Sequence, residues 1–596
     1  MAKMSDAPGE ARRAERGSRI LVIALVGAFL FGMLGFAVAV IDAQNEPAPT
    51  AVPAPSLPAL PDTLPGAGEA AQDELPSPQA RSSRILLALA EPSPSTPPSP
   101  VTSTPPVAAL DPNASAAPGP SIAVAPALEP AAMPVVPVVS FWSKREGIHR
   151  GVVVRALKQG KLDGFKRVVV DDLVADALAA ELGIELHPDV RRLDAPRVAR
   201  AVSKGALGLL AAPSLGPSVR ALEMEGRSLV GVERIKDSER WPLSVELEPG
   251  PGATWRQQDT WVLLAGGDAF TDRGVYDTVV RKGKGVDYPF DGGTAKVTGH
   301  GCCDPVFNDN VVPRYTLTGN KGAVRRLFRQ AELAVANHEQ PVTEQARFHS
   351  SGTRFSGQPA LTRIFTRAGI DFLSLANNHI GDYGAEGIRA TRRILRQHDI
   401  AFGGAGKDLD QARKVELLEA NGTKVAIIPC LDIVRAYWAG DAKAGATPCV
   451  DQYIKKDIRK AKRAGAGVIV VFPHWGVEYT RQPLASMRKH AARWVEAGAD
   501  LVIGAHSHVA GSIEEVEGVP VLYSLGNLIF DQHWSTDTME SAMLEATFHG
   551  HQVVELRLLP YIIHDTSQPN LLDPAKGEGR RLLLAMKKAS SSWLDW

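Results

Sequence analysis

VIVVFPHWG at 468–476 and DLVIGAHSH at 500–508 show the pattern that decides the fold: a short apolar run that ends in a polar cluster. A third copy, DFLSLANNH at 371–379, is followed by a segment with apolar residues at helical spacing. Short apolar runs that alternate with helices are typical of strands in an α/β sheet. The sequence therefore predicts an α/β domain in which polar clusters follow the strands.

The same pattern occurs at three further points of the chain. A strand at 261–265 runs into GGDAFTDR, one at 332–336 runs into NHEQP, and one at 521–523 runs into SLGN. In open α/β sheets, ligands bind at the carboxyl ends of the strands. We therefore expect Asp, Asn, Glu and His side chains from separate strands to converge at one edge.

These residue types suit a metal site. His and carboxylate ligands bind Zn, Mn or Fe, and two ions about 3.5–4 Å apart would clamp the attacking and leaving oxygens of a phosphoester. His506 and His508, two residues apart, would point the same way on an extended segment. A single His after a strand is more often a core or capping residue, but several such clusters favour a metal or phosphate site.

Two long segments resemble the capsule-synthesis (CapA, poly-γ-glutamate) family. They are GIDFLSLANNHIGDYGAEGIRATRRILRQHDIAFGGAG at 369–406 and VIVVFPHWGVEYTRQPLASMRKHAARWVEAGADLVIGAHSHVAGSIEEVEGVPVLYSLGNLIFD at 468–531. The shorter matches GGDAFTDRG, AELAVANHEQPVT and FSGQPAL occur in the same order, so the resemblance covers about 261–560. The family is related to calcineurin-like metallophosphoesterases, which implies a four-layer α/β/β/α sandwich with a dinuclear metal site at the strand ends.

The resemblance also implies roles for individual residues. His379 would be a ligand or general acid, and Asp382 would orient its turn, so these two form the expected catalytic pair. One or two divalent ions, Mn, Zn or Fe, would be the cofactor. The expected metal ligands are Asp268, Asn337, Glu339, Asn378, His474, His506 and His508.

The first two motifs depart from those of phosphoesterases. The Asp-x-His motif is Asp268-Ala269-Phe270 here, so one His ligand is missing, and Asn337 or Glu339 stands where a bridging Asp is usual. His338 either replaces the missing ligand or faces away. Fewer anionic ligands favour weaker binding of a second ion, so a single-metal or metal-poor site is an open alternative.

The N-terminal region has the pattern of a membrane anchor. Residues 20–41 carry no charged side chain, and a spanning helix needs about 20 residues. Five basic residues precede this run and acidic ones follow it, which predicts a cytoplasmic N-terminus at 1–19 and an exported remainder. A cleaved signal peptide is the alternative, although its apolar region is normally shorter. We expect a single-pass protein of the cell membrane.

A stalk and a small domain should follow the anchor. From Pro47 to Pro137 the chain holds 23 of its 44 prolines, so 42–137 is predicted to be a disordered tether in which 85–90 forms a transient helix. Short strands and two helices predict a small α/β domain at 138–250, for which ligand binding, partner binding and a spacer role are all open. The metal-site domain should cover 255–572, and 573–596 a helical tail.

Bulk properties exclude some classes of protein. The chain has 596 residues with 66 basic and 66 acidic side chains, so no basic excess indicates nucleic-acid binding. Four cysteines are too few for a disulfide scaffold, but Cys430 and Cys449 could pair outside the cytoplasm. Cys302 and Cys303 could be free, bonded or metal-binding. The Gly- and Asp-rich segment 281–314 around them should be a long loop over the site.

Two functions fit this sequence. The first is a metal-dependent hydrolase of a phosphoester or an envelope polymer, with His379 protonating the leaving group. The second is a non-catalytic subunit of a capsule-synthesis complex that binds polymer or partner subunits. The missing His of the first motif favours the second function, and the retained histidines favour the first.

Overall fold

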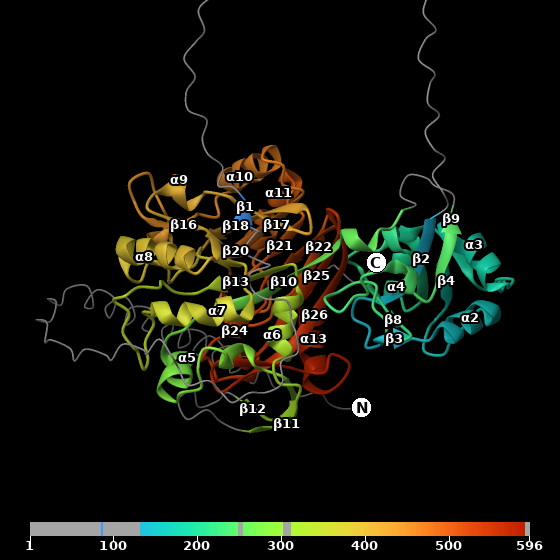
Figure 1. Ribbon diagram of the computed structural model, residues 1–596, viewed down its shortest axis with the longest axis horizontal. Coiled ribbons are helices and arrows are strands. Elements are labelled where there is room, and N and C mark those ends of the chain that lie inside the picture. The colour runs from blue at the N-terminus through green and yellow to red at the C-terminus, as the bar shows by residue number, and fades with distance from the viewer. Residues whose placement is uncertain (1–84, 87–130, 248–253, 302–310, 591–596) are drawn as a thin grey trace, which may run out of the picture. The chain divides into compact units, whose positions relative to one another are not determined.

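The computed structural model describes residues 85–86, 131–247, 254–301 and 311–590, and its largest part is built on two sheets (Figure 1). The larger sheet has the strand order β12-β11-β27-β26-β25-β10-β13-β14-β15, with β24 also paired to β10. Its strands are β10 (Thr260–Ala269), β11 (Thr294–Gly301), β12 (Val312–Gly319), β13 (Leu333–His338), β14 (Phe372–Ser374), β15 (Ala401–Gly403), β24 (Asn527–Ile529), β25 (Glu540–His549), β26 (Gln552–His564) and β27 (Gln568–Leu571).

The second sheet has the order β1-β17-β18-β20-β21-β23-β22. Its strands are β1 (Ile85–Leu86), β17 (Glu416–Ala420), β18 (Thr423–Leu431), β20 (Val468–His474), β21 (Leu501–Ile503), β22 (Ile513–Val516) and β23 (Val519–Leu522). In each sheet one run of neighbouring strands is parallel, namely β10-β13-β14-β15 and β18-β20-β21-β23. The polar clusters predicted to follow strands all lie at the carboxyl ends of these parallel runs.

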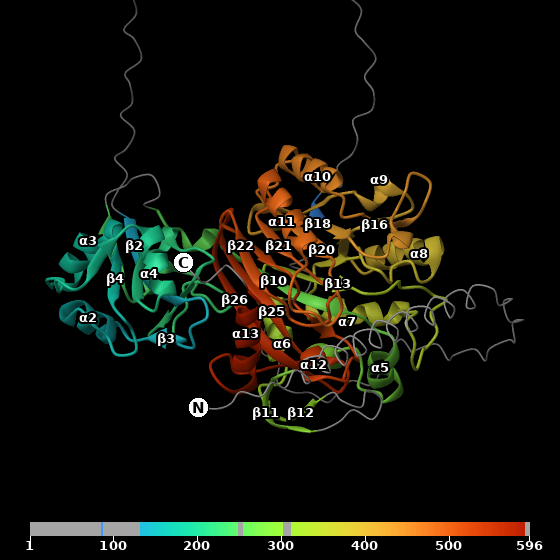
Figure 2. The same ribbon diagram turned by 180° about the vertical axis from the view of Figure 1, so that it is seen from behind.

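Helices cover the outer face of each sheet, which gives the predicted order helix, sheet, sheet, helix (Figures 1 and 2). Alternate residues of β10, such as Trp261 and Leu263, pack between the sheets against Val470 and Ile503, while Val262 and Leu264 face the helices of the larger sheet. The helices of the larger sheet are α6 (Ala323–Gln330), α7 (Arg363–Ala368) and α8 (Gly384–Gln397), and those of the second are α10 (Asp451–Arg463) and α11 (Ala485–Ala497).

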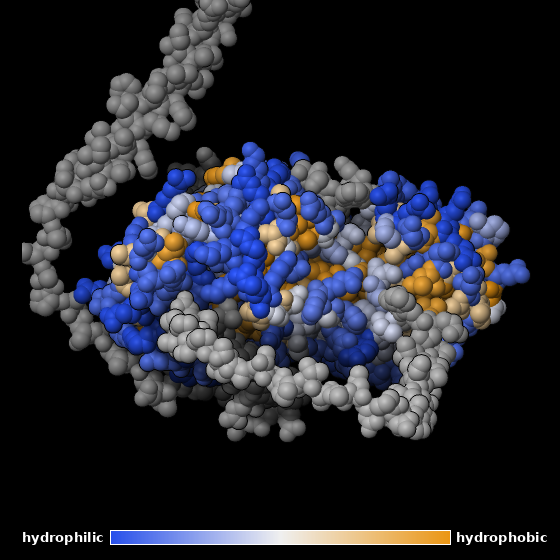
Figure 3. Space-filling view, turned by 90° about the horizontal axis from the view of Figure 1, so that it is seen from above, coloured by the Kyte–Doolittle hydropathy of each residue, from blue (hydrophilic) through white to orange (hydrophobic). Residues whose placement is uncertain are grey.

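The outward faces of α10 and α11 are polar. Of the 13 residues of α10, four are buried, and these include Ile454, Ile458 and Ala461. The face seen in Figure 3, which carries these two helices, is mostly hydrophilic, with hydrophobic side chains in smaller patches. This pattern is that of an amphipathic surface helix over an apolar core.

The small N-terminal domain is an α/β unit, as predicted, but it begins earlier. Its sheet has the order β5-β4-β6-β2-β7, with β9 also paired to β2, and the first strand, β2 (Ala131–Ser140), starts seven residues before position 138. The prolines in this segment argued against a strand in the sequence. Pro134 ends the β9 pairing and Pro137 precedes the β7 pairing at Val138, so neither nitrogen is needed as a donor in the β7 or β9 ladder. The other elements are α2 (Arg150–Gln159), β3 (Gly147–Ile148), β4 (Val168–Asp171), α3 (Asp172–Leu182), β5 (Arg191–Leu193), α4 (Ala195–Ser203), β6 (Leu207–Ala211), β7 (Val219–Ala221), β8 (Glu223–Met224) and β9 (Ser244–Leu247).

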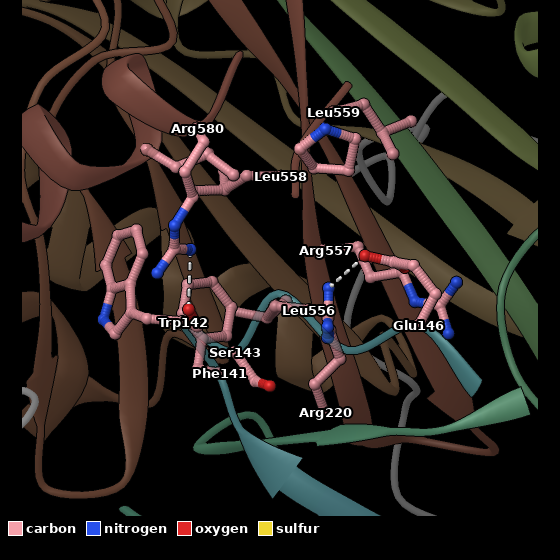
Figure 4. A pocket seen from close by; sticks show the side chains of 12 residues that line it. Phe141, Trp142, Ser143, Glu146, Arg220, Leu556, Arg557, Leu558, Leu559 and Arg580 are labelled. Atoms are coloured by element: carbon pink, nitrogen blue, oxygen red, sulfur yellow. Dashed lines mark hydrogen bonds and ion pairs between the residues drawn. The ribbon is translucent and has the colours of Figure 1, made fainter. Parts of the chain in front are cut away.

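Polar contacts connect the small domain to β25 and β26. The buried carboxylate of Glu555 accepts a hydrogen bond from the Ala221 backbone N–H at 2.8 Å, and Glu545 accepts one from Val232 at 3.3 Å. Figure 4 shows the pocket beside these contacts, where Arg220 pairs with Glu146 at 3.2 Å and Arg580 donates to the carbonyl of Trp142. Buried polar contacts therefore attach the small domain to β25 and β26.

The structure corrects or extends three further sequence predictions. Segment 281–314 is not a long loop, because β11 and β12 form a hairpin there that extends the larger sheet. Ile85–Leu86 is a strand paired with β17, so the predicted helix at 85–90 is wrong at these two residues. Within the predicted tail, α13 (Gly577–Ala589) is a helix that buries Leu582 and Met586 in the core between the sheets.

Some predictions fall on residues outside the described ranges. These are the anchor at 20–41, most of the stalk, and Cys302 with Cys303. Within the described ranges, no helix is both long and apolar enough to cross a bilayer. The pairing of Cys430 with Cys449 is confirmed as a disulfide, which joins the end of β18 to the segment that leads into α10.

Candidate metal centre

Asp268 reaches the site through a glycine pair at the end of β10. A Cβ at Gly267 would lie 1.8 Å from the Gly526 carbonyl oxygen, so only glycine allows β24 to approach this closely. The Asp268 backbone N–H donates to that same oxygen at 2.9 Å, and the strand pairing shifts register between Ala265 and Asp268. The fully buried Asp268 carboxylate is thereby fixed between β13 and β24.

The end of β13 places Asn337 and Glu339 at the site and His338 away from it. The Asn337 amide nitrogen donates to Asp268 Oδ1 at 2.8 Å and also to the Glu339 carboxylate. His338 packs its ring edge-on against Phe365 of α7, with ring centroids 5.2 Å apart. Because neighbouring residues of a strand face opposite sides, His338 cannot replace the missing ligand of the first motif.

Glu339, His474 and His506 form the candidate ion-binding group. Their ligand atoms lie within 4.8 Å of one another, and all three residues are buried. The Nε2 atom of His474 lies 3.1 Å from Glu339 Oε1 and 2.7 Å from the Asn378 side-chain oxygen. Two buried atoms of this group form no hydrogen bond: His506 Nδ1, and Glu339 Oε1, whose 3.1 Å approach to His474 lacks hydrogen-bond geometry. Buried polar atoms are nearly always paired, so these two atoms fit the ligands of a cation.

The segment with His506 and His508 is not extended as predicted. Both residues have positive φ, +97° and +58°, which non-glycine residues rarely adopt and which is frequent at functional sites. The His506 backbone N–H donates to Asp268 Oδ2 at 3.0 Å, and His508 Nδ1 contacts the Asn527 side-chain oxygen at 2.8 Å. The two rings still converge, with centroids 6.1 Å apart, because the strained backbone turns both toward the site.

His379 and Asp382 form a dyad that is partly open to solvent. His379 Nδ1 lies 3.0 Å from Asp382 Oδ2, and that oxygen also accepts the Phe355 backbone N–H at 2.8 Å. The Phe355 ring lies 4.2 Å from the His379 ring. The carboxylate therefore fixes the proton on Nδ1 and leaves Nε2 as the nitrogen able to exchange a proton with a ligand.

The electrostatics of the site also favour a cation. Burial, reinforced by the charge of Glu339, raises the pKa of Asp268 to about 8, and burial also raises the pKa of Glu339. Burial lowers the pKa of His474 and of His506 well below the ordinary value, so both imidazoles are neutral near pH 7. Neutral imidazoles beside carboxylates in need of a counter-charge are the donor set that a divalent ion requires.

The structure brings together every residue predicted for the site and adds two that the sequence did not single out. Asn377 donates to the His338 carbonyl at 2.7 Å and to the Asn337 side-chain oxygen at 3.3 Å. Asn527 holds His508 and is itself held by Gln532 at 3.0 Å. Asn377 directly follows a predicted strand and Asn527 is the last residue of the SLGN cluster, so the pattern of polar clusters could have indicated both. The roles assigned to the site residues remain predictions.

Comparisons with known proteins place this site in context. A family model described as "Bacterial capsule synthesis protein PGA_cap" matches residues 262–532. The chain is 30% identical over 271 residues to the PGA biosynthesis protein CapA of Bacillus subtilis, covering 44% of this chain and 71% of that protein. It is 30% identical over 248 residues to the capsule biosynthesis protein CapA of Bacillus anthracis, covering 40% of this chain and 60% of that protein.

Solved structures with a similar arrangement include a calcineurin-like phosphoesterase, YfkN, from Bacillus subtilis. It is 12% identical with a TM-score of 0.28, and the match covers 56% of this chain and 98% of that chain. The NAD nucleotidase NadN of Haemophilus influenzae is 13% identical with a TM-score of 0.29, and the match covers 56% of this chain and 57% of that chain.

Proposed function

Because the chain belongs to the PGA_cap family of bacterial capsule synthesis proteins, we propose that it is a metal-dependent hydrolase of an envelope polymer or a phosphoester in capsule or poly-γ-glutamate production. The observation that carries this proposal is the buried group of Glu339, His474 and His506, in which two ligand atoms form no hydrogen bond. We further propose that residues 20–41 anchor the protein in the cell membrane and that the domains act outside the cytoplasm, with subunits of a synthesis complex as partners.

The residues present fit one divalent ion. Glu339, His474 and His506 would hold it, with Asp268 and Asn378 within reach of the same atoms through their contacts with His506 and His474. Such an ion would supply Lewis-acid polarisation of the bond to be cleaved. The position of the missing His is filled by Phe270, whose ring stacks on Phe530 at 4.1 Å, so this side of the site is apolar. We therefore propose one ion of Mn, Zn or Fe rather than two.

Side chains of the protein would carry out the proton transfer to the leaving group. With Nδ1 held by Asp382, the other nitrogen of His379 is free to donate a proton to the leaving group. Asp382 also accepts a hydrogen bond from Phe355, so the loop at 354–356 keeps the dyad oriented. Asp382→Asn should lower kcat by about tenfold to a thousandfold with little change in KM, because it removes orientation and charge but not binding.

A hydrolysis assay tests this function. The full-length protein in detergent is incubated with Mn, Zn or Fe and with p-nitrophenyl phosphate, bis-p-nitrophenyl phosphate or poly-γ-glutamate, beside His379→Ala and Asp382→Asn. His149→Gln serves as a control, because that histidine is exposed on the small domain. Activity that is lost in both site variants and kept in the control supports the proposal. Equal activity in all four proteins would overturn it.

The alternative is a non-catalytic subunit that binds polymer or partner subunits in a synthesis complex. The apolar packing of Phe270 where phosphoesterases place a His favours this alternative. A chain that binds a metal ion and polymer yet hydrolyses none of the three substrates would support it.

A further inference from the structure

A second pocket lies outside the metal centre, on the outer layer of the larger sheet. It is formed by one face of α8, by Lys407, and by Gln411 of α9 (Leu409–Ala412). Helix α8 lies beside β16 (Ala405–Gly406) in both ribbon views (Figures 1 and 2). The polar side chains that line the pocket are Arg389, Arg392, Arg396, Lys407 and Gln411, and none of the lining residues is acidic.

The arginines of this pocket lie along a single stripe of α8. Positions 389, 392 and 396 are three and four residues apart, so each side chain follows the previous one by about one helical turn. Arg392 and Arg396 share the ring of Phe402, with their guanidinium carbons 5.1 Å and 5.2 Å from its centroid. Two positive charges are therefore held close together in the lining of the pocket, one on the buried Arg392 and one on the exposed Arg396.

This arrangement carries an energetic cost. Arg392 is 7% exposed, and one of its amino groups donates to the Ala405 carbonyl. Burial, reinforced by the charge of Arg396, lowers the pKa of Arg392 to about 10, although the charges of Glu416 and Asp408 oppose the shift. Within the described residues, neither arginine forms an ion pair, whereas Arg393 on the next face of the helix pairs with Glu344 at 2.7 Å. A buried cation that forms no ion pair is costly, and an anion in the pocket would lower that cost.

The positive charges at the rim of the pocket are partly neutralised by neighbouring carboxylates. Arg389 pairs with Glu386, and Lys407 lies 3.5 Å from Asp408. Arg389, Glu386 and Lys407 are at least half exposed, which makes these pairs weak, so a ligand with a stronger negative charge could displace them. The excess positive charge therefore belongs to Arg392 and Arg396.

We propose that this pocket binds the carboxylate groups of an acidic polymer, a poly-γ-glutamate chain, and so forms a second binding site beside the metal centre. The proposal rests on the proposed function for the choice of polymer. Arginine binds carboxylates through two parallel hydrogen bonds, and guanidiniums one turn apart match a ligand that repeats its charge. Helix α8 begins at Gly384, two residues after Asp382, so the stripe starts next to the His379 turn and leads away from it.

A binding titration in EDTA tests the site without any dependence on metal or turnover. Fluorescein-labelled poly-γ-glutamate of defined length is titrated with the full-length protein in detergent, beside Arg396→Gln and Lys407→Gln. Arg393→Gln is the matched control, because it removes the same charge from the same helix outside the pocket. We expect Arg396→Gln to weaken binding by about tenfold, and Arg393→Gln to change it less than about twofold. Each variant is checked for an unchanged melting temperature.

The outcomes separate this proposal from the proposed hydrolase. Equal weakening by Arg396→Gln and Arg393→Gln would overturn it, since the effect would then follow net charge alone. Inorganic phosphate or polyphosphate that displaces the label more strongly than unlabelled polyglutamate would also overturn it. Polymer binding that depends on Arg396 in a chain without hydrolytic activity would leave the pocket in place and remove the hydrolase.

Discussion

At the scale of single residues, the site depends on backbone positions that few side chains tolerate. Gly267 lets the oxygen of Gly526 approach β10, and His506 and His508 occupy positive φ. These features hold Asp268 and the two imidazoles around one point. Strain of this kind is retained only where the surrounding structure enforces it.

Gly267→Ala should disrupt this arrangement. The added Cβ would lie 1.8 Å from a backbone oxygen, so β10 and β24 must separate. We expect a loss of about 1–3 kcal/mol in the free energy of unfolding, measured by urea denaturation, together with weaker metal binding. Gly299→Ala is the control, because its Cβ would meet no atom within 4 Å. Equal stability of the two variants would contradict this reading.

Ionisation of Glu540 should make the free energy of unfolding depend on pH. Burial raises the pKa of this carboxyl from 4.5 to about 8, although its partner Arg581 on α13 opposes the shift. The protonated form is therefore favoured in the folded state. Its contribution to stability is complete below about pH 4.5 and is lost as the pH rises through about 8.

Comparison with Glu540→Gln isolates this group. The variant stays neutral, so the free energy of unfolding of the wild type, minus that of the variant, should fall between about pH 4.5 and about pH 8 and then level off. Urea denaturation at a series of pH values measures the difference. A difference that does not change with pH would show that Glu540 does not titrate in this range.

At the scale of elements, the disulfide between Cys430 and Cys449 closes a loop between the end of β18 and the start of α10. The cysteines are 19 residues apart, for which chain entropy predicts about 3 kcal/mol of stabilisation. Cys430→Ser/Cys449→Ser should lose about that amount in urea denaturation. Reduction of the wild-type protein should cause a similar loss, and a variant as stable as the oxidised wild type would contradict this estimate.

The sequence could predict the elements that position the site, because strands buried on both faces are nearly continuous apolar runs and their polar ends are distinct. It could not predict β2, whose prolines fall where the β7 and β9 ladders need no donor. The hairpin of β11 and β12 was also missed, since most of its residues are exposed or half-buried and only a short apolar face packs on the sheet. The direction of the His506 and His508 side chains depends on φ values that only tertiary contacts enforce.

At the scale of the whole molecule, the small domain is coupled to the larger one through buried carboxylates. Glu545 and Glu555 accept backbone N–H groups of the small domain, and each loss would leave a buried donor unpaired at a cost of about 1–3 kcal/mol. We expect the wild type to show one calorimetric unfolding transition for both domains and Glu545→Ala/Glu555→Ala to show two. Glu181→Ala, which changes an exposed residue of α3, is the control and should keep one transition. A single transition in Glu545→Ala/Glu555→Ala would show that these carboxylates do not couple the two domains.

Metal stoichiometry tests whether Glu339, His474 and His506 hold a metal ion. The full-length protein is saturated with Mn, Zn or Fe, dialysed, and measured by plasma mass spectrometry beside His506→Ala and Glu339→Gln. His187→Ala, a change on the small domain, is the control. We expect about one ion per chain in the wild type and the control, and loss of that ion in both site variants. A wild type without bound metal, or site variants that retain it, would show that these three residues do not form a metal site.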